Sequence, residues 1–201
     1  MSYSDFSLKR AKEELGINII ESRAIFSHIK GVEISSLLMS VMKYNVPLAM
    51  AIGTEKARSE MIIANILIEI KKIMDEKISL FSGVNFDVDR DKSLNGFCDF
   101  IISKSQEQFY ISAPIIMIVE SKDDKTTAGL GQCVAEMYAA SIFNRNEGFN
   151  LPILYGTVTT GSNWRFLKYE DNTVFIDMDE YPIENLSKIL GILVQMVKQN
   201  A

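Results

Sequence analysis

Apolar positions in the second quarter of the chain repeat at helical spacing. Thr54 suits a helix N-cap, and the repeat then runs from Glu55 to about Lys77. The expected inward face consists of Ala57, Met61, Ala64, Leu67 and Ile68. Arg58 and Glu69 belong to the opposite, wet face. Glu60 breaks this division because its helical neighbours are apolar, so we expect its carboxylate to point toward the core and to need a partner there.

Four other segments show helical patterns, namely residues 4–15, 33–44, 130–143 and 184–199. Gly16 ends the first of them, and Asn45 and Pro47 are expected to end the second. Residues 16–26 fit either a strand or an extended arm.

Strand patterns occupy most of the remaining chain. Residues 80–88, 97–103 and 109–122 form three strand-like runs joined by polar, turn-like connections, as expected for antiparallel neighbours. Later runs cover residues 151–159, 164–169 and 174–178. The order predicts a single α/β domain over residues 1–201, with a mixed β-sheet flanked by helices. Its core spans roughly residues 54–178, after an N-terminal helical extension over 1–50 and before a C-terminal helix.

Charged residues stand at the end of the most apolar run. The residues from Ala113 to Val119 are apolar or small, which is typical of a strand buried on both faces. Glu120 and Lys122 follow and share a strand face, while Ser121 points away. Asp99 lies on the strand expected to pair with this one, so the two carboxylates should converge at one end of the sheet.

Two carboxylates at close range need a cation. Oxygen ligands of this kind suit Mg²⁺ or Mn²⁺, which can lower the pKa of a bound water. A lysine on the same face could orient that water or stabilise developing negative charge. These are the parts that phosphodiester hydrolysis requires.

Asp99 and the segment Glu120-Ser121-Lys122 resemble the signature of the PD-(D/E)xK nuclease superfamily. Glu60 resembles an accessory acid, and Gln132 resembles a glutamine that follows the signature in several branches. The resemblance covers roughly residues 60–169. It implies a restriction-endonuclease-like αβββαβ core, magnesium dependence and cleavage of nucleic acid. It also implies catalytic roles for Glu60, Asp99, Glu120, Lys122 and Gln132, with metal ligands from Asp99, Glu120, Glu60 and the backbone carbonyl of Ser121.

Four residues depart from the family pattern. Cys98 stands where the signature has proline, and Glu136 stands where one branch has tyrosine four residues after the glutamine. Asp123 and Asp124 add negative charge directly after Lys122, which is unfavourable beside a DNA phosphate.

Composition narrows the function classes. The net charge is −5, which argues against a protein whose whole surface is basic and binds nucleic acid. Two cysteines and one histidine are too few ligands to favour a zinc site. We expect a cytoplasmic protein without signal peptide or membrane span, acting on nucleic acid, with DNA as the expected substrate. A homodimer would suit cleavage of both strands. The alternatives are a non-catalytic nucleic-acid-binding or regulatory protein of the same fold, and another enzyme in which the charges form a structural ion pair.

Overall fold

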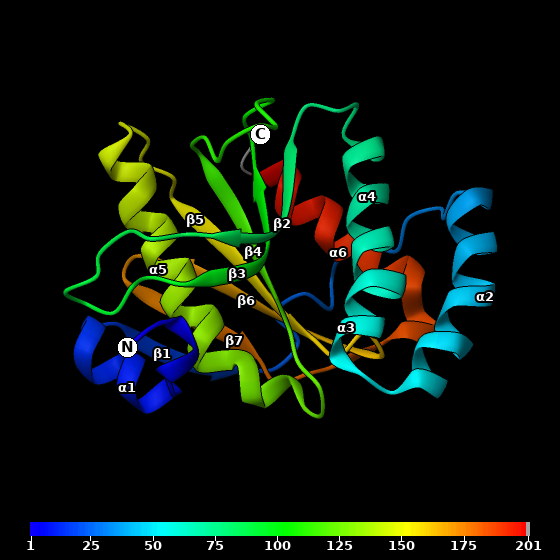
Figure 1. The fold of residues 1–201 in the computed structure, drawn as a ribbon, viewed down its shortest axis with the longest axis horizontal. Coiled ribbons are helices and arrows are strands. Elements are labelled where there is room, and N and C mark those ends of the chain that lie inside the picture. The colour runs from blue at the N-terminus through cyan, green and yellow to red at the C-terminus, as the bar shows by residue number, and fades with distance from the viewer. Residues whose placement is uncertain (200–201) are drawn as a thin grey trace.

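A mixed β-sheet of eight strands forms the centre of the molecule in the computed structural model, which describes residues 1–199 (Figure 1). The strands are β1 (Asn18–Ser22), β2 (Ser79–Asn85), β3 (Phe97–Ser103), β4 (Ile115–Ser121), β5 (Ile153–Thr159), β6 (Asn163–Glu170), β7 (Thr173–Asp177) and β8 (Tyr181–Pro182). Their order across the sheet is β1-β7-β6-β5-β4-β3-β2, and β8 pairs with β6. The predicted α/β class with a mixed sheet is therefore confirmed.

The pairing directions follow from the lengths of the connections. β2, β3 and β4 form an antiparallel meander, whereas β5 returns parallel to β4 after a helical crossover. β6 and β7 continue antiparallel, and β1 closes the far edge parallel to β7. Residues 18–22, which the sequence left open between strand and arm, are thus a strand of the same sheet.

Helices cover both faces of the sheet (Figure 1). They are α1 (Leu8–Leu15), α2 (Ser36–Ile52), α3 (Glu55–Arg58), α4 (Ala64–Ile73), α5 (Leu130–Asn146) and α6 (Leu186–Gln199). A π-helical turn, η2 (Ser59–Ile63), joins α3 to α4. The short 3₁₀ segments are η1 (Tyr3–Asp5), η3 (Thr126–Gly129) and η4 (Ile183–Asn185). α5 and α1 lie on one face and α4 and α6 on the other, with α2 outside the α3–α4 run.

β4 is the most buried strand, and every one of its seven residues is buried. Its side chains contribute to both apolar clusters, one on each face of the sheet: Ile115 and Ile118 to one, and Ile116, Met117 and Val119 to the other. Asn144 of α5 fixes the start of the strand, because its side-chain amide both accepts from the Ile115 N–H and donates to the Ile115 carbonyl, each at 2.7 Å. The expectation of a strand buried on both faces is confirmed.

The predicted end of the second helix at Asn45 and Pro47 is wrong, because α2 continues to Ile52 with Pro47 inside it. Pro47 removes the N–H that would bond the Lys43 carbonyl, but both residues are exposed, so water can replace that donor. The Asn45 side chain also donates to the Met61 carbonyl at 2.9 Å, which ties this part of α2 to the next helical run. Packing against the next helical run therefore outweighs the tendency of Asn45 and Pro47 to end the helix.

The predicted inward face of the next helix is confirmed for Ala57 and Leu67, which are buried, and for Met61 and Ala64, which pack against the core, but it is wrong for Ile68. The π-helical turn at Ser59–Ile63 rotates the helix that follows, so that Ile62, Ile63, Ile66 and Ile70 are fully buried. Ile68, expected inside, is 50% exposed. Arg58 and Glu69, expected on the wet face, are instead buried.

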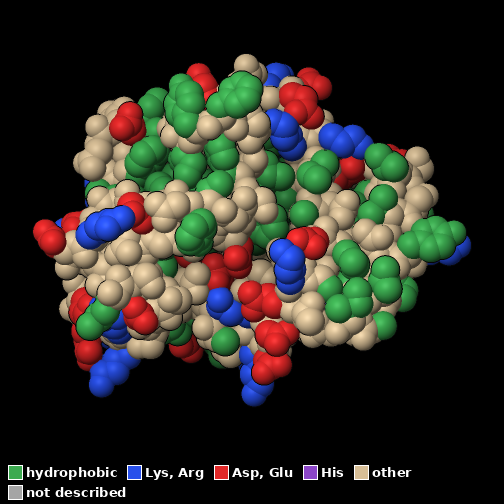
Figure 2. All heavy atoms as spheres, in the orientation of Figure 1, with side chains coloured by type: hydrophobic (Ala, Val, Ile, Leu, Met, Phe, Trp, Pro, Cys, Tyr) green, Lys and Arg blue, Asp and Glu red, His purple; other side chains and the backbone are tan. Residues whose placement is uncertain are grey.

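The third strand of the meander begins later than predicted. Residues 109–114 are not a strand, β4 starts at Ile115, and the peptide bond between Ala113 and Pro114 is cis. Phe109 and Tyr110 are exposed and line an apolar groove with Phe81, Phe86 and Phe143. Figure 2 shows apolar side chains gathered in a hollow on this part of the surface.

Among residues 1–199, none of the helices combines the length and the hydropathy that crossing a membrane requires.

Candidate active site at the ends of β3 and β4

The register of the sheet brings the two predicted carboxylates together. Phe100 of β3 lies opposite Val119 of β4, so the next positions along the two strands are Asp99 and Glu120. Side chains opposite each other in an antiparallel pair share a face. Asp99 Oδ2 also accepts a hydrogen bond from the Ser121 N–H at 2.7 Å, which fixes the carboxylate beside β4.

Lys122 lies on the same side as Glu120. Its Nζ forms an ion pair with Glu120 Oε1 and donates a second hydrogen bond to Gln132 Oε1 at 3.2 Å. The Glu120 side chain is 1% exposed and that of Lys122 is 22% exposed, so the pair lies just beneath the surface. Gly129 permits this arrangement, because a Cβ there would lie 2.9 Å from Lys122 Cγ and 3.2 Å from Glu120 Cγ.

Burial and mutual repulsion perturb the carboxyl groups. Burial, reinforced by the neighbouring Asp99, raises the pKa of Glu120 to about 8. Burial likewise raises the pKa of Asp99. Burial acts to lower the pKa of Lys122, but the adjacent Glu120 outweighs it and the net shift is upward. Glu120 Oε2 is buried and has no hydrogen-bond partner among the described residues. The site therefore carries an acidic oxygen that lacks a partner.

A pocket of about 260 Å³ opens beside Asp99 and Ser121. Its other lining residues are Glu55, Lys56, Ser59, Glu60, Ser82 and Gly83. In Figure 2, acidic and basic side chains gather near the lower centre of the face shown, beneath the strand ends and beside α3. Asp99 thus lines a pocket that opens to solvent, whereas the buried Glu120 lies behind it and does not line the pocket.

Glu60 does not point toward the core, and that prediction is wrong. Its side chain is 60% exposed and pairs with Lys56 at 2.9 Å on the rim of the pocket. Glu55, about one helical turn earlier, is the helix carboxylate whose pKa responds to the charges of the site. Its pKa is raised by burial, and the charges of Lys122 and Asp99 act on it.

Sequence reasoning missed Glu55 because the π-helical turn changes the helix phase after it. The only signal was its place immediately after the N-cap Thr54, whose side chain accepts from the Ala57 N–H. An acidic residue in a first helical turn is ordinary, so this place alone does not mark a site.

Glu136 continues the polar contacts inward from Lys122. Gln132 Nε2 donates to Glu136 Oε1 at 3.0 Å, while Gln132 Oε1 receives Lys122. Glu136, on the sheet-facing side of α5, is fully buried, and burial raises its pKa well above the ordinary value. The charges of Glu120, Asp99 and Lys122 also act on the pKa of Glu136. Glu136 in turn helps to raise the pKa values of the Cys98 and Cys133 thiols and of the Tyr3 hydroxyl.

Glu136→Gln is expected to raise the free energy of unfolding, and the gain should grow as the pH rises above 5. The folded protein keeps the Glu136 proton where the unfolded chain has already released it, so wild-type stability falls with rising pH by at most about 1.4 kcal/mol per pH unit from this group. Glutamine has no such proton. Urea unfolding at pH 5, 6, 7 and 8 measures the difference, with Glu147→Gln, exposed just beyond the same helix, as the control. A gain that is independent of pH would contradict the expectation.

Arg58 neutralises one of the two aspartates that follow Lys122. Its Nη2 donates to the Asp123 carbonyl at 2.6 Å and to Asp123 Oδ1 at 2.5 Å. Arg58 is buried, whereas the Asp123 side chain is 61% exposed. The charge of Asp123 is therefore balanced by the helix before the meander, while Asp124 stays exposed.

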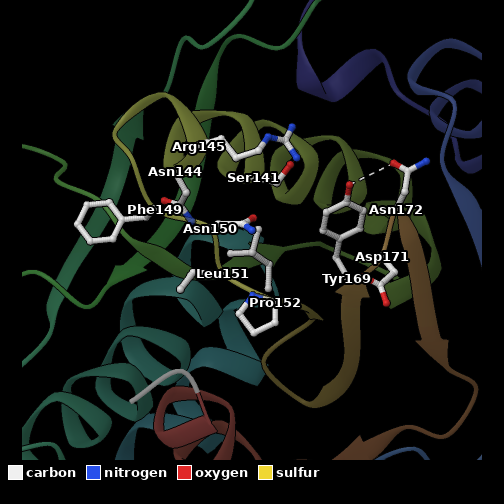
Figure 3. A pocket seen from close by; sticks show the side chains of 11 residues that line it. Ser141, Asn144, Arg145, Phe149, Asn150, Leu151, Pro152, Tyr169, Asp171 and Asn172 are labelled. Carbon is white, nitrogen blue, oxygen red and sulfur yellow. Dashed lines mark hydrogen bonds between the residues drawn. The ribbon is translucent and has the colours of Figure 1, made fainter.

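Basic side chains could contact phosphates, but those of Arg165 and Lys168 already bind other groups of the protein. Arg165 bonds the Asp177 carbonyl, Thr126 and Glu180, and Lys168 pairs with Glu170. Arg145 belongs to a separate pocket of about 330 Å³ between the end of α5 and the β6–β7 turn (Figure 3). It lies about 20 Å along α5 from Gln132, at 1.5 Å per residue. Trp164 is fully buried in the core.

Comparison of the chain with models of protein families, with curated protein sequences and with solved structures finds no match in any of the three. Within the described part of the chain, no group of three or more histidine, cysteine, aspartate or glutamate side chains is placed to hold a metal ion. Function is therefore inferred from the geometry around Asp99, Glu120 and Lys122.

Proposed function

We propose that this protein is a divalent-cation-dependent nuclease that hydrolyses phosphodiester bonds of nucleic acid, with DNA as the expected substrate and the cytoplasm as its location. The observation that carries the proposal is the placement of Asp99 and Glu120 opposite each other, with Lys122 on the same side and a pocket alongside. Hydrolysis of a phosphodiester needs an oriented water and positive charge near the phosphate. A lysine beside two carboxylates can serve both needs when a cation is bound.

The donor set fits a hard cation such as Mg²⁺ or Mn²⁺. Asp99, Glu120 with its unpartnered Oε2, and the Ser121 main-chain carbonyl offer oxygen ligands, and Mg²⁺ usually keeps several waters rather than filling a protein cage. The raised pKa of Glu120 supports this fit, because two adjacent carboxyls disfavour joint ionisation until a cation joins them. When bound, the ion would polarise the phosphate and lower the pKa of a water.

The residues of the chain hold and orient the reactants. Lys122, fixed between Glu120 and Gln132, would direct its ammonium toward the attacking water or toward the charge that develops on the phosphate. Attack by that water would form a new P–O bond and break the bond to the leaving oxygen; the attacking water would release a proton to solvent and the leaving oxygen would take one up from solvent. Glu55 is better placed than Glu60 as the accessory acid, because it lies partly buried beside the same pocket.

The order of elements also supports the proposal. A helical run, three antiparallel strands, a crossover helix and a strand parallel to the third are consistent with the αβββαβ core that resemblance to PD-(D/E)xK nucleases implies. The residues that carry the resemblance, Asp99 and Glu120-Ser121-Lys122, lie at the ends of β3 and β4. A second copy of the chain would supply a second site for the opposite strand of a duplex.

Cleavage assays test the proposal. Wild-type protein with Mg²⁺ or Mn²⁺ should cut plasmid DNA or a labelled oligonucleotide, and Asp99→Asn should reduce the rate at least about 100-fold. Single-stranded DNA, duplex DNA and RNA should be compared under the same conditions. Asp91→Asn, at an exposed position of the 86–96 connection, is the matched control and should keep full activity.

Parallel variants separate the two helix carboxylates. Glu55→Gln should reduce cleavage more than Glu60→Gln does, because Glu60 is exposed and paired with Lys56. Equal rates for wild type and Asp99→Asn would refute the nuclease assignment. Absence of cation binding in titration calorimetry, with the fold intact, would favour the non-catalytic alternative.

A further inference from the structure

Glu136 is a carboxyl group placed where an apolar side chain would be expected. It is fully buried beside Cys98 and Cys133 on the α5 side of the sheet, and its Oε2 has no hydrogen-bond partner within residues 1–199. Burying a polar group without full compensation costs on the order of 1–3 kcal/mol. Gln132 donates a hydrogen bond to the carboxyl group, and the Cys98 thiol is a second hydrogen-bonding neighbour.

That hydrogen bond determines which way the Gln132 amide faces. A side-chain amide has a donating and an accepting end, and the two ends bond different groups here. Nε2 donates to Glu136 Oε1 at 3.0 Å, which leaves Oε1 toward Lys122 at 3.2 Å. Lys122 can only donate, so a reversed amide would place two donors against each other. The orientation that Glu136 selects is the one that Lys122 needs.

We propose that Glu136 is a positioning residue: it holds the Gln132 amide so that its carbonyl oxygen receives Lys122, and it thereby fixes the lysine ammonium beside Glu120. Glu136 does not line the pocket, and its hydrogen bond toward Lys122 runs through Gln132. The effect on cleavage rests on the proposed nuclease function, whereas the effect on the position of Lys122 does not.

The structural arm of the test follows Lys122 directly. In protein labelled with ¹³C and ¹⁵N lysine, the Lys122 side-chain signals should shift in Gln132→Met and in Glu136→Met by a similar amount. Glu136→Gln keeps a carbonyl acceptor for Gln132 and should leave the signals close to those of wild type. Glu136→Asp shortens the side chain by one methylene and should shift them, which provides a second variant if Glu136→Met fails to fold.

The kinetic arm uses cleavage with Mg²⁺. Loss of an outer partner that orients a site residue costs about 10-fold to 100-fold. Glu136→Met should therefore lower kcat at least about tenfold with KM unchanged, and Glu136→Gln should restore it. Once Gln132→Met is present, adding Glu136→Met should cause no further loss, because both act through one contact.

The outcomes are distinguishable. Unchanged Lys122 signals in folded Glu136→Met and Glu136→Asp, with a shift in Gln132→Met, would overturn the positioning role. Independent, additive losses of kcat in the Gln132 and Glu136 variants would also overturn it. If wild-type protein cuts no nucleic acid, the nuclease proposal fails while the lysine signals still decide the role of Glu136.

Discussion

Replacing Lys122 with methionine is expected to reduce cation-dependent cleavage by about three orders of magnitude, the effect of removing one preorganised charge at a developing oxyanion. Methionine keeps the length of the side chain and removes its charge. The ion pair with Glu120 and the hydrogen bond to Gln132 disappear together. Oligonucleotide cleavage under single-turnover conditions measures the loss without interference from product release.

The same change should destabilise the fold, because it leaves a buried carboxyl without its cationic partner. Glu120 is 1% exposed and its other oxygen already lacks a partner, so we expect a loss of about 2 kcal/mol in the free energy of unfolding. Glu120→Gln combined with Lys122→Met should recover most of that stability, since a neutral amide has no charge to bury. Activity should stay at the level of Lys122→Met alone.

If the double variant recovers stability but not activity, the charged pair belongs to a reactive site and is not only a structural ion pair. Lys9→Met is the matched control, because the Lys9 side chain is 83% exposed on α1, and it should change neither quantity. Cleavage by Lys122→Met above a tenth of the wild-type rate would contradict a catalytic role. Recovery of both quantities in the double variant would assign the pair to structure alone.

The parts of the fold that were predictable from sequence are those where one local pattern determines the outcome. The apolar run from Ala113 to Val119 has enough hydrophobic residues for burial on both faces, and β4 is buried throughout. The convergence of Asp99 and Glu120 followed from the antiparallel pairing expected for their strands, and the register places them opposite each other. Ordinary strand geometry was sufficient for the centre of the site.

The errors arise where packing between distant segments overrides the local pattern. Pro47 predicted a helix end, but α2 is held on both sides of it by buried Met42 and Ala49. Glu60 was assigned inward by counting 3.6 residues per turn, and the π-helical turn at Ser59–Ile63 changes that count. Because a π-helical turn leaves little trace in composition, Glu55 and Arg58 could not be recognised from periodicity.

The aspartates after Lys122 show how a missed partner alters an interpretation. From the sequence alone, the negative charges of Asp123 and Asp124 would both repel a phosphate near the site. In the structure, Arg58 reaches across from α3 and balances Asp123. Gly161, with φ of +79°, provides room for this arginine, because a Cβ there would lie 3.0 Å from Arg58 Cβ. One unbalanced aspartate remains in place of two.

Arg58→Met is expected to lower the free energy of unfolding by about 2 kcal/mol, because it removes the charged hydrogen bond from a buried guanidinium to the Asp123 main-chain carbonyl. Arg58 bonds the main-chain carbonyl of Asp123 as well as its carboxylate. The connection from Lys122 to η3 is held at its other end by Thr126, which bonds Arg165 and Glu180. Without Arg58 the end nearest Lys122 loses its anchor, so cleavage should also fall, by about 10-fold to 100-fold.

Asp123→Ala separates the two contacts that Arg58 makes. It removes the carboxylate but leaves the main-chain carbonyl, and because the Asp123 side chain is 61% exposed the loss should stay below about 1 kcal/mol. Amide hydrogen exchange over residues 122–126 gives the local measurement: protection should fall in Arg58→Met and persist in Asp123→Ala. Unchanged protection in Arg58→Met would contradict the anchor. The position of Lys122 would then depend on the Lys122 N–H bond to the Thr159 carbonyl and on its side-chain contacts with Glu120 and Gln132.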